Sequence, residues 1–232
     1  PAYTAWWQKD SKLSAPRNSH LKTVMDFSFY DKINQAMREE SSNYTGLGRI
    51  YNNFVYDFLY PNPLSVLAFI ENHDTDRFLG EGNNLATLKQ AATLLLTTRR
   101  IPQLYYGTEV LMNGTKQATD GHVRKDFPGG WTSDEANAFT STQLDSLQRD
   151  CYRFFQRLLH WRKGNEVIAR GEMTQFLVQQ GVYAYARHYE GRTVLVLLNG
   201  TDAPTTLPLH YYKEVLGHAV QGRDVISGRI VP

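Results

Sequence analysis

Cysteine is nearly absent from this sequence, and a strong net charge, a long apolar run and a signal-peptide pattern are absent as well. A single cysteine, Cys151, among 232 residues excludes an intramolecular disulfide and any metal site built from several cysteines. The net charge of +2, from 25 basic and 23 acidic side chains, does not indicate a nucleic-acid partner. Apolar runs fall far short of the about 18 residues needed to cross a membrane. PAYTAWWQKD lacks the pattern of a signal peptide. We therefore expect neither nucleic acid nor a membrane as partner.

The chain shows two patterns, with the change near residues 164 and 165. In the first part, short apolar segments alternate with long helical patterns. Strands are expected at residues 21–29, 65–70 and 101–106, and helices at residues 84–99, with Asn83 or Asn84 as cap, and at residues 141–163. Strands that are apolar on both faces and alternate with helices predict a parallel sheet covered by helices.

The helical pattern over residues 141–163 also predicts where the single cysteine lies. Cys151 falls on the same stripe as Leu144, Leu147, Phe154 and Leu158. We therefore expect a thiol packed in the core and not a nucleophile.

After residue 165 the apolar period drops to two. Val182, Ala184 and Ala186 alternate with more polar or aromatic neighbours, and Glu190-Gly191 is typical of a two-residue hairpin turn into a strand at 193–198. Further strands are expected near residues 173–178 and 205–210. Residues 165–232 are therefore predicted to form a small antiparallel β-domain.

The densest polar cluster, ENHDTDR at residues 71–77, follows the second predicted strand. In parallel α/β sheets, side chains just beyond the carboxyl end of a strand face the ligand site. This placement predicts a functional loop. Two other interpretations stay open at this point: a solvated turn with an Asp–Arg ion pair, and a metal site made by His73, Asp74 and Asp76.

Three phrases together resemble the α-amylase superfamily of glycoside hydrolases, and more narrowly its neopullulanase and cyclomaltodextrinase branch. They are AFIENHDTDRF at residues 68–78, RIPQLYYGTEV at 100–110 and VRKDFPGGW at 123–131. The resemblance implies an α/β fold in which residues 1–164 form the last three strand–helix units of a (β/α)₈ barrel. The strands at 21–29, 65–70 and 101–106 would then be the sixth, seventh and eighth. Residues 165–232 would form the small β-sandwich that follows the barrel.

The same resemblance implies retaining hydrolysis of α-glucosidic bonds, with α-1,4 links as the main target and α-1,6 links as a wider expectation. Such chemistry uses a carboxylate nucleophile and a carboxylic acid about 5–5.5 Å apart. The family adds a third catalytic carboxylate that binds sugar hydroxyls, and by motif position this is Asp74. His73 would bind the same sugar ring. Asp76 and Arg77 would line the site or pair with each other.

The later phrases supply the remaining expected site residues. Arg124 would hold the loop after the eighth strand over the cleft together with Asp126, an ordinary surface ion pair being the alternative. Trp131 would stack on a sugar, whereas packing is favoured for Tyr105 and Tyr106. Glu109 is expected to have a structural role. No cofactor is expected; calcium could enter the parent enzyme, although nothing in this sequence indicates it.

The sequence also departs from the family. The nucleophile phrase Gly-x-Arg-x-Asp is absent, the fifth-strand Glu is absent, and PAYTAWWQKD is similar to the segment just after that Glu. We therefore expect the C-terminal part of a larger enzyme, with one of three catalytic carboxylates and no activity alone. Its ligands would be α-glucan oligosaccharides or cyclodextrins. It would either form homo-oligomers or pair with the missing N-terminal portion, and the resemblance suggests the periplasm.

Two other function classes stay open beside this enzyme. One is a non-catalytic piece of the same fold that binds glucans or mediates interactions. The other is an unrelated α/β protein whose ENHDTDR loop binds a metal.

Overall fold

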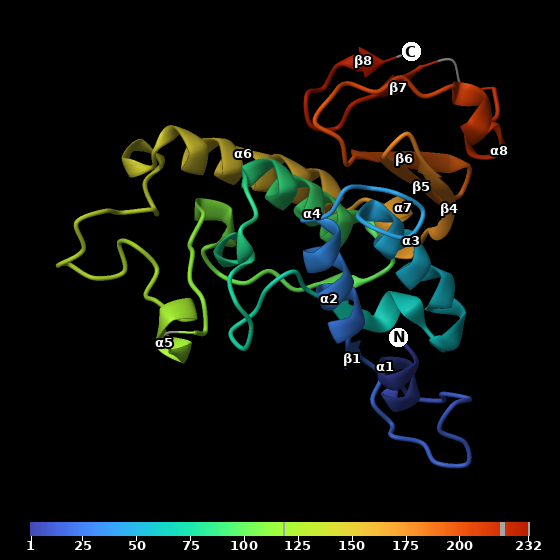
Figure 1. The fold of residues 1–232 in the computed structure, drawn as a ribbon, viewed down its shortest axis with the longest axis horizontal. Helices are drawn as coiled ribbons and strands as arrows, with labels where there is room; N and C mark the ends of the chain where they lie inside the picture. The colour runs from blue at the N-terminus through green and yellow to red at the C-terminus, as the bar shows by residue number, and fades with distance from the viewer. Residues whose placement is uncertain (118, 219–220, 232) are drawn as a thin grey trace.

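The computed structural model describes residues 1–117, 119–218 and 221–231 (Figure 1). A parallel sheet of order β1-β2-β3 lies in the first part, formed by β1 (Val24–Met25), β2 (Val66–Ala68) and β3 (Ile101–Pro102). Around it lie α1 (Ala2–Trp7), α2 (Phe27–Ala36), α3 (Leu47–Phe54), α4 (Leu85–Thr97), α5 (Asp120–Val123) and α6 (Ser146–Arg162). Short 3₁₀ turns connect them: η1 (Val55–Leu59), η2 (Pro63–Ser65), η3 (Phe78–Glu81), η4 (Thr108–Val110) and η5 (Ser141–Gln143). The expected parallel sheet with helices is confirmed. No helix among the described residues is long and apolar enough to cross a membrane.

The second part contains antiparallel sheets. After α7 (Glu166–Arg170) come β4 (Glu172–Gln179), β5 (Val182–Tyr189) and β6 (Arg192–Asn199), paired in that order. The segment η6 (Leu209–Tyr212), α8 (Lys213–Leu216) and the hairpin of β7 (Gly222–Arg223) and β8 (Ile230–Val231) follow. The prediction of a strand near residues 205–210 is therefore wrong, because this stretch contains no strand and ends in the helical turn η6. The tip of the β5–β6 hairpin is confirmed: Glu190 and Gly191 both have positive φ, of 48° and 73°, as a turn that follows the strand twist requires.

The expected strand at residues 21–29 is correct only for its two central residues. Asp26 ends it, because its carboxylate accepts a hydrogen bond from the Phe29 amide at 3.0 Å and so caps α2. An N-cap satisfies an amide that the first helical turn leaves without a partner, and this favours helix over strand from Phe27 onward. The other two strands are also shorter than the apolar runs that contain them.

Local capping signals place the two long helices well. Asn84 and Thr87 form a reciprocal capping box at the start of α4, as expected from the sequence. Asp145 and Gln148 do the same for α6, so this helix begins five residues later than its predicted start at residue 141. Cys151 is fully buried on α6, and burial raises the pKa of its thiol to about 12. The expectation of a thiol packed in the core is confirmed.

The two sheets share one hydrophobic core, because β5 packs against the helices of the first part (Figure 1). Tyr185 is fully buried and shares a hydrogen bond with the Thr97 hydroxyl at the end of α4. Arg187 is also fully buried and donates to the carbonyls of Thr97 at 2.7 Å, Ile168 at 2.9 Å and Gly171 at 2.8 Å. Burial lowers the pKa of Arg187 to about 10. The domain boundary at residues 164 and 165 stays a prediction.

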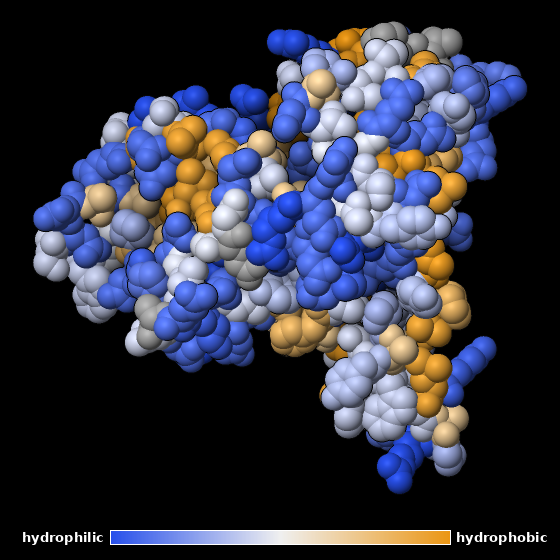
Figure 2. All heavy atoms as spheres, in the orientation of Figure 1, coloured by the Kyte–Doolittle hydropathy of each residue, from blue (hydrophilic) through white to orange (hydrophobic). Residues whose placement is uncertain are grey.

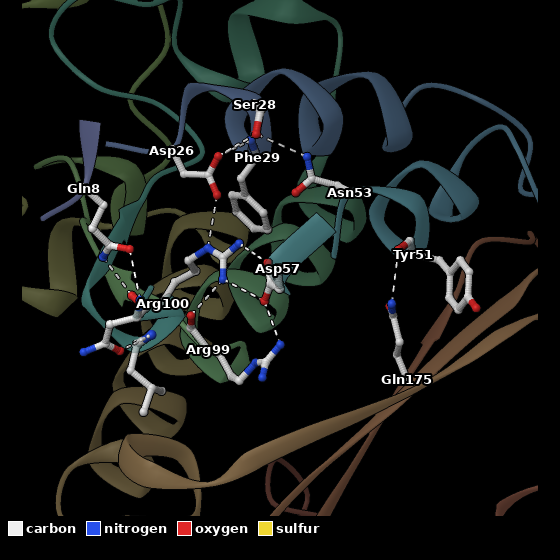
Figure 3. A network of polar contacts seen from close by, with 12 residues as sticks. Gln8, Asp26, Ser28, Phe29, Tyr51, Asn53, Asp57, Arg99, Arg100 and Gln175 are labelled. Carbon is white, nitrogen blue, oxygen red and sulfur yellow. Dashed lines mark hydrogen bonds and ion pairs between the residues drawn. The ribbon is translucent and has the colours of Figure 1, made fainter. Parts of the chain in front are cut away.

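A buried ion network ties the short strands of the first sheet together (Figure 3). Arg100, just before β3, donates through Nε to Asp26 Oδ2 at 3.1 Å and through Nη2 to Asp57 Oδ1 at 2.6 Å. Arg99 binds the other oxygen of Asp57 at 2.9 Å. Burial by itself lowers the pKa of Arg100, but Asp57 and Asp26 overcome this effect and hold it above its ordinary value.

We predict that Arg100→Met destabilises the chain by about 3–5 kcal/mol, because it leaves two buried carboxylates without a countercharge. The measurement is the free energy of unfolding from urea denaturation. Arg192→Met is the matched control, because Arg192 forms an exposed pair with Glu166 at 3.2 Å. Exposed pairs contribute little, so the control is expected to unfold close to the wild type. Equal stabilities of the two variants would contradict the importance of this network.

Candidate functional site

The loop after β2 presents two polar side chains to solvent. Asn72 Oδ1 accepts a hydrogen bond from the Asp74 amide at 2.8 Å, and Thr75 Oγ1 accepts one from the Asn72 amide at 2.9 Å. These local bonds turn the backbone, as Asn and Thr side chains commonly do. The His73 and Asp74 side chains are left 58% and 57% exposed. The two residues therefore project from the carboxyl end of a sheet strand, where the sequence predicts a ligand site.

Asp74 is held by a cation from a distant part of the chain. Its Oδ1 accepts from Arg124 Nη2 at 3.0 Å, and its Oδ2 lies 3.3 Å from His73 Nε2. Arg124 also donates from Nε to the His73 carbonyl at 2.8 Å. The structure thus brings Arg124, His73 and Asp74 together. The alternative of a surface ion pair between Arg124 and Asp126 is wrong, because Arg124 pairs with Asp74 and Asp126 accepts from the indole nitrogen of Trp131 at 3.0 Å.

Two further residues belong to this cluster and are not identified by the sequence reasoning. Asp120 Oδ2 lies 3.1 Å from Arg124 Nη2, and Asp120 Oδ1 lies 3.3 Å from Lys116 Nζ. Lys116 also donates its amide to Asp76 and its ammonium to the Asp74 carbonyl at 3.1 Å. A signal for Asp120 is present in the sequence, since opposite charges four residues apart meet on one helix face.

Arg77 does not lie at the surface, contrary to the expectation that it lines the site or pairs with Asp76. Its side chain is 1% exposed, and Nη1 binds Glu71 Oε1 at 3.1 Å. The guanidinium carbon lies 3.9 Å from the centre of the Tyr105 ring. A guanidinium enclosed in this way has no access to a ligand in solution. The expectation that Arg77 contacts the substrate is therefore wrong, and its side chain makes its contacts in the interior.

The aromatic residues divide between surface and interior. Trp131 is 63% exposed and available for stacking. Tyr105 is partly buried against Arg77, and burial raises the pKa of its hydroxyl to about 12. The Tyr106 hydroxyl donates to the Lys125 carbonyl at 2.6 Å. Burial also raises the pKa of the Glu109 carboxyl.

The arrangement offers exposed carboxylates, a guanidinium and an imidazole that can exchange hydrogen bonds with a ligand rich in hydroxyl groups. Among the described residues, no three His, Cys, Asp or Glu side chains lie together as a metal site. His73, Asp74 and Asp76 therefore do not form the metal centre of the third interpretation, because Asp74 and Asp76 turn to Arg124 and the Lys116 amide instead.

Comparison with known proteins agrees with this fold. Cyclomaltodextrin glucanotransferase from Geobacillus stearothermophilus is 27% identical over 246 aligned positions, which cover 98% of this chain and 31% of that protein. The structure of an α-amylase from Geobacillus thermoleovorans, complexed with acarbose, matches with a TM-score of 0.61 and 26% identity, over 78% of this chain and 37% of that one. An Anoxybacillus α-amylase shares the fold over 100% of this chain and 45% of its own, with a TM-score of 0.70 and 23% identity.

The chain is therefore similar to members of the α-amylase superfamily, a family of glycoside hydrolases and transferases. It corresponds to the C-terminal part of these proteins and spans about a third of the length of the curated relatives that it matches. Residues 173–232 match the family model of the cyclomaltodextrinase C-terminal domain.

Proposed function

We propose that this chain supplies the C-terminal part of a retaining α-glucan hydrolase of the neopullulanase or cyclomaltodextrinase type. In this proposal, residues 1–164 form the last three strand–helix units of a (β/α)₈ barrel, and residues 165–232 form its β-sandwich domain. The observation that carries the proposal is the exposed Asp74 carboxylate beyond the carboxyl end of β2, held by Arg124 at 3.0 Å. In (β/α)₈ barrels the active site lies at this end of the strands.

The expected site residues other than Arg77 each have a role in the proposed reaction. Asp74 accepts hydrogen bonds from sugar hydroxyls, and these bonds strengthen as the ring distorts toward the oxocarbenium-like transition state. His73 donates to the same ring, Arg124 and Asp76 bind neighbouring hydroxyls, and Trp131 offers an apolar face to a further sugar. The nucleophile and the general acid belong to the parent enzyme and not to this chain.

The comparisons support an α-glucan as the ligand. One relative is a cyclomaltodextrin glucanotransferase, and the α-amylase from Geobacillus thermoleovorans was crystallised with acarbose. We propose α-1,4-linked oligosaccharides and cyclodextrins as substrates of the parent enzyme, and α-1,6 links as a wider range. Because the Gly-x-Arg-x-Asp phrase is absent, one alternative stays open for the chain by itself: a glucan-binding piece without activity.

We predict that the 232-residue chain alone does not release new reducing ends from maltoheptaose, pullulan or β-cyclodextrin. Retaining hydrolysis needs one carboxylate to attack the anomeric carbon and a second to protonate the leaving oxygen. Asp74 binds hydroxyls in this proposal and does neither. Turnover by the purified chain that disappears in an Asp74→Asn control would show that the catalytic pair lies within these residues.

In the enzyme that includes this chain, Asp74→Asn is predicted to lower kcat and kcat/KM together. Its contact is strongest in the transition state, so substrate binding changes little. The expected loss is about 2.7–4 kcal/mol, or roughly a hundred- to a thousandfold. His73→Ala is expected to cost less, because a neutral hydrogen bond is weaker than one to a charge. Steady-state kinetics on maltoheptaose measure both, and a near-normal kcat for Asp74→Asn would remove the assignment.

The outer strands of the first sheet carry exposed apolar side chains. Met25 on β1, Ile101 on β3 and Leu104 beyond it are 38%, 40% and 38% exposed. Phe27 is 50% exposed at the start of α2, and Figure 2 shows further hydrophobic residues on the lobe that holds α1. Open strand edges beside apolar surface favour pairing with another chain. We propose that this surface binds a second copy or a chain that completes the barrel.

Light scattering tests this association directly. The purified chain is predicted to form dimers or larger assemblies at micromolar concentration, because burial of apolar surface drives association. Met25→Lys combined with Ile101→Lys places charges on both outer strands and is expected to shift the population toward monomer. Lys substitution at Leu177, which is 55% exposed on β4, serves as the control for an added surface charge. A stable wild-type monomer contradicts the prediction.

A further inference from the structure

Glu71 and Arg77 form a buried ion pair beneath the exposed site. Their side chains are 2% and 1% exposed, and Glu71 Oε1 lies 3.1 Å from Arg77 Nη1. Glu71 also accepts hydrogen bonds from the Phe78 amide at 2.5 Å and from the Thr108 hydroxyl. Because Thr108 follows β3, this carboxylate joins the loops at the ends of β2 and β3. These bonds satisfy the buried Glu71 carboxylate, as a buried charge requires, whereas Arg77 Nη2 is buried without a hydrogen-bond partner.

The other contacts of Arg77 reach the segment that carries Arg124. Its amide donates to the Gly114 carbonyl at 3.0 Å, and its Nε donates to the Val123 carbonyl at 3.0 Å. Its Nη1 also donates to the Tyr106 carbonyl at 2.7 Å. Arg77 therefore binds the segment after β3 near both of its ends. Gly114 lets the two ends of this segment approach each other, since a Cβ there would lie 2.1 Å from the His122 carbonyl oxygen.

Val123 directly precedes Arg124, so its anchoring sets where the Arg124 side chain begins. The Arg124–Asp74 pair is itself exposed, at 40% and 57%, and exposed pairs are too weak to order a long segment. We propose that Arg77, supported by Glu71, is a positioning residue that holds Arg124 over Asp74. This inference rests on the proposed function, in which Asp74 and Arg124 bind the glucan. Arg77 acts through the backbone of Val123 and does not touch the ligand.

Arg77→Lys tests the proposal in the full chain. Lysine keeps the charge opposite Glu71 but cannot supply the guanidinium fork that binds several carbonyls at once. Hydrogen exchange of the amides in residues 112–117 and 119–125 is expected to accelerate roughly tenfold, because local opening of this segment becomes easier. Unchanged exchange in these residues would overturn the proposal.

Arg187→Lys is the matched control. Arg187 is also fully buried, and the carbonyls to which it donates among the described residues are those of Thr97, Ile168, Gly171 and Glu172, outside the segment that is measured. Its substitution is expected to leave exchange in residues 112–125 within about twofold of the wild type, as distant sites act independently. Equal acceleration by both variants would show a loss of global stability instead and would overturn the positioning role.

Thr108→Val is the second variant, for the case that Arg77→Lys does not fold. It conserves shape and removes the hydroxyl whose single proton lies between Glu71 and the Tyr105 carbonyl, at a site that is 4% exposed. Exchange in residues 112–125 is expected to accelerate in the same direction by a smaller factor. No acceleration in this variant, with Arg77→Lys unfolded, would also overturn the proposal.

A glucan titration separates this inference from the proposed function. Binding of maltoheptaose is followed by NMR on the wild type and on both arginine variants, with Arg77→Lys expected to bind roughly tenfold more weakly and Arg187→Lys about as well as the wild type. No binding by the wild type would overturn the proposed function, while the exchange data still decide whether Arg77 orders the segment. Full binding by Arg77→Lys despite faster exchange would overturn the role in ligand binding.

Discussion

The buried guanidinium of Arg100 is the contact on which the first half of the structure depends. Strands of two or three residues share few backbone hydrogen bonds, so the sheet needs other contacts to hold its register. Arg100 supplies them by binding Asp26 at the end of β1 and Asp57 from the connection to β2 (Figure 3). The arginine cannot lose its charge, and its donors match two carboxylates at once. The network thereby ties the carboxyl end of β1 to the connection before β2 and to the residue that precedes β3.

The candidate functional site combines a buried ion pair with an exposed one. Glu71 and Arg77 form a buried pair in which Arg77 Nη2 has no hydrogen-bond partner, whereas Asp74 and Arg124 form an exposed pair. The low dielectric of the interior strengthens the first pair and gives it its structural weight. The exposed pair is screened by water and can exchange its partners for sugar hydroxyls. A rigid buried pair together with an exposed pair that can change partners suits the binding of a hydroxyl-rich ligand.

Features governed by neighbouring residues were predictable from the sequence. The Asn84 cap of α4, the burial of Cys151 on a helical stripe and the Glu190-Gly191 hairpin turn all depend on a few adjacent positions. The position of Asp74 was predictable as well, because an apolar strand followed by a polar loop defines the carboxyl edge of a sheet. The α-amylase resemblance rests on the same contiguous phrases, and the comparisons confirm it.

Pairings across long sequence separations could not be predicted in the same way. Arg77 stands beside Asp76 in the sequence, yet it turns inward to Glu71, and Arg124 reaches Asp74 instead of the nearby Asp126. Long charged side chains can reach many partners, and the choice among them depends on which loops the packed sheet brings together. By itself, the sequence determined the helices, the turn and the exposed carboxylate. Only the tertiary structure decided which charges are buried and which face the solvent, because that outcome follows from the packing of distant segments.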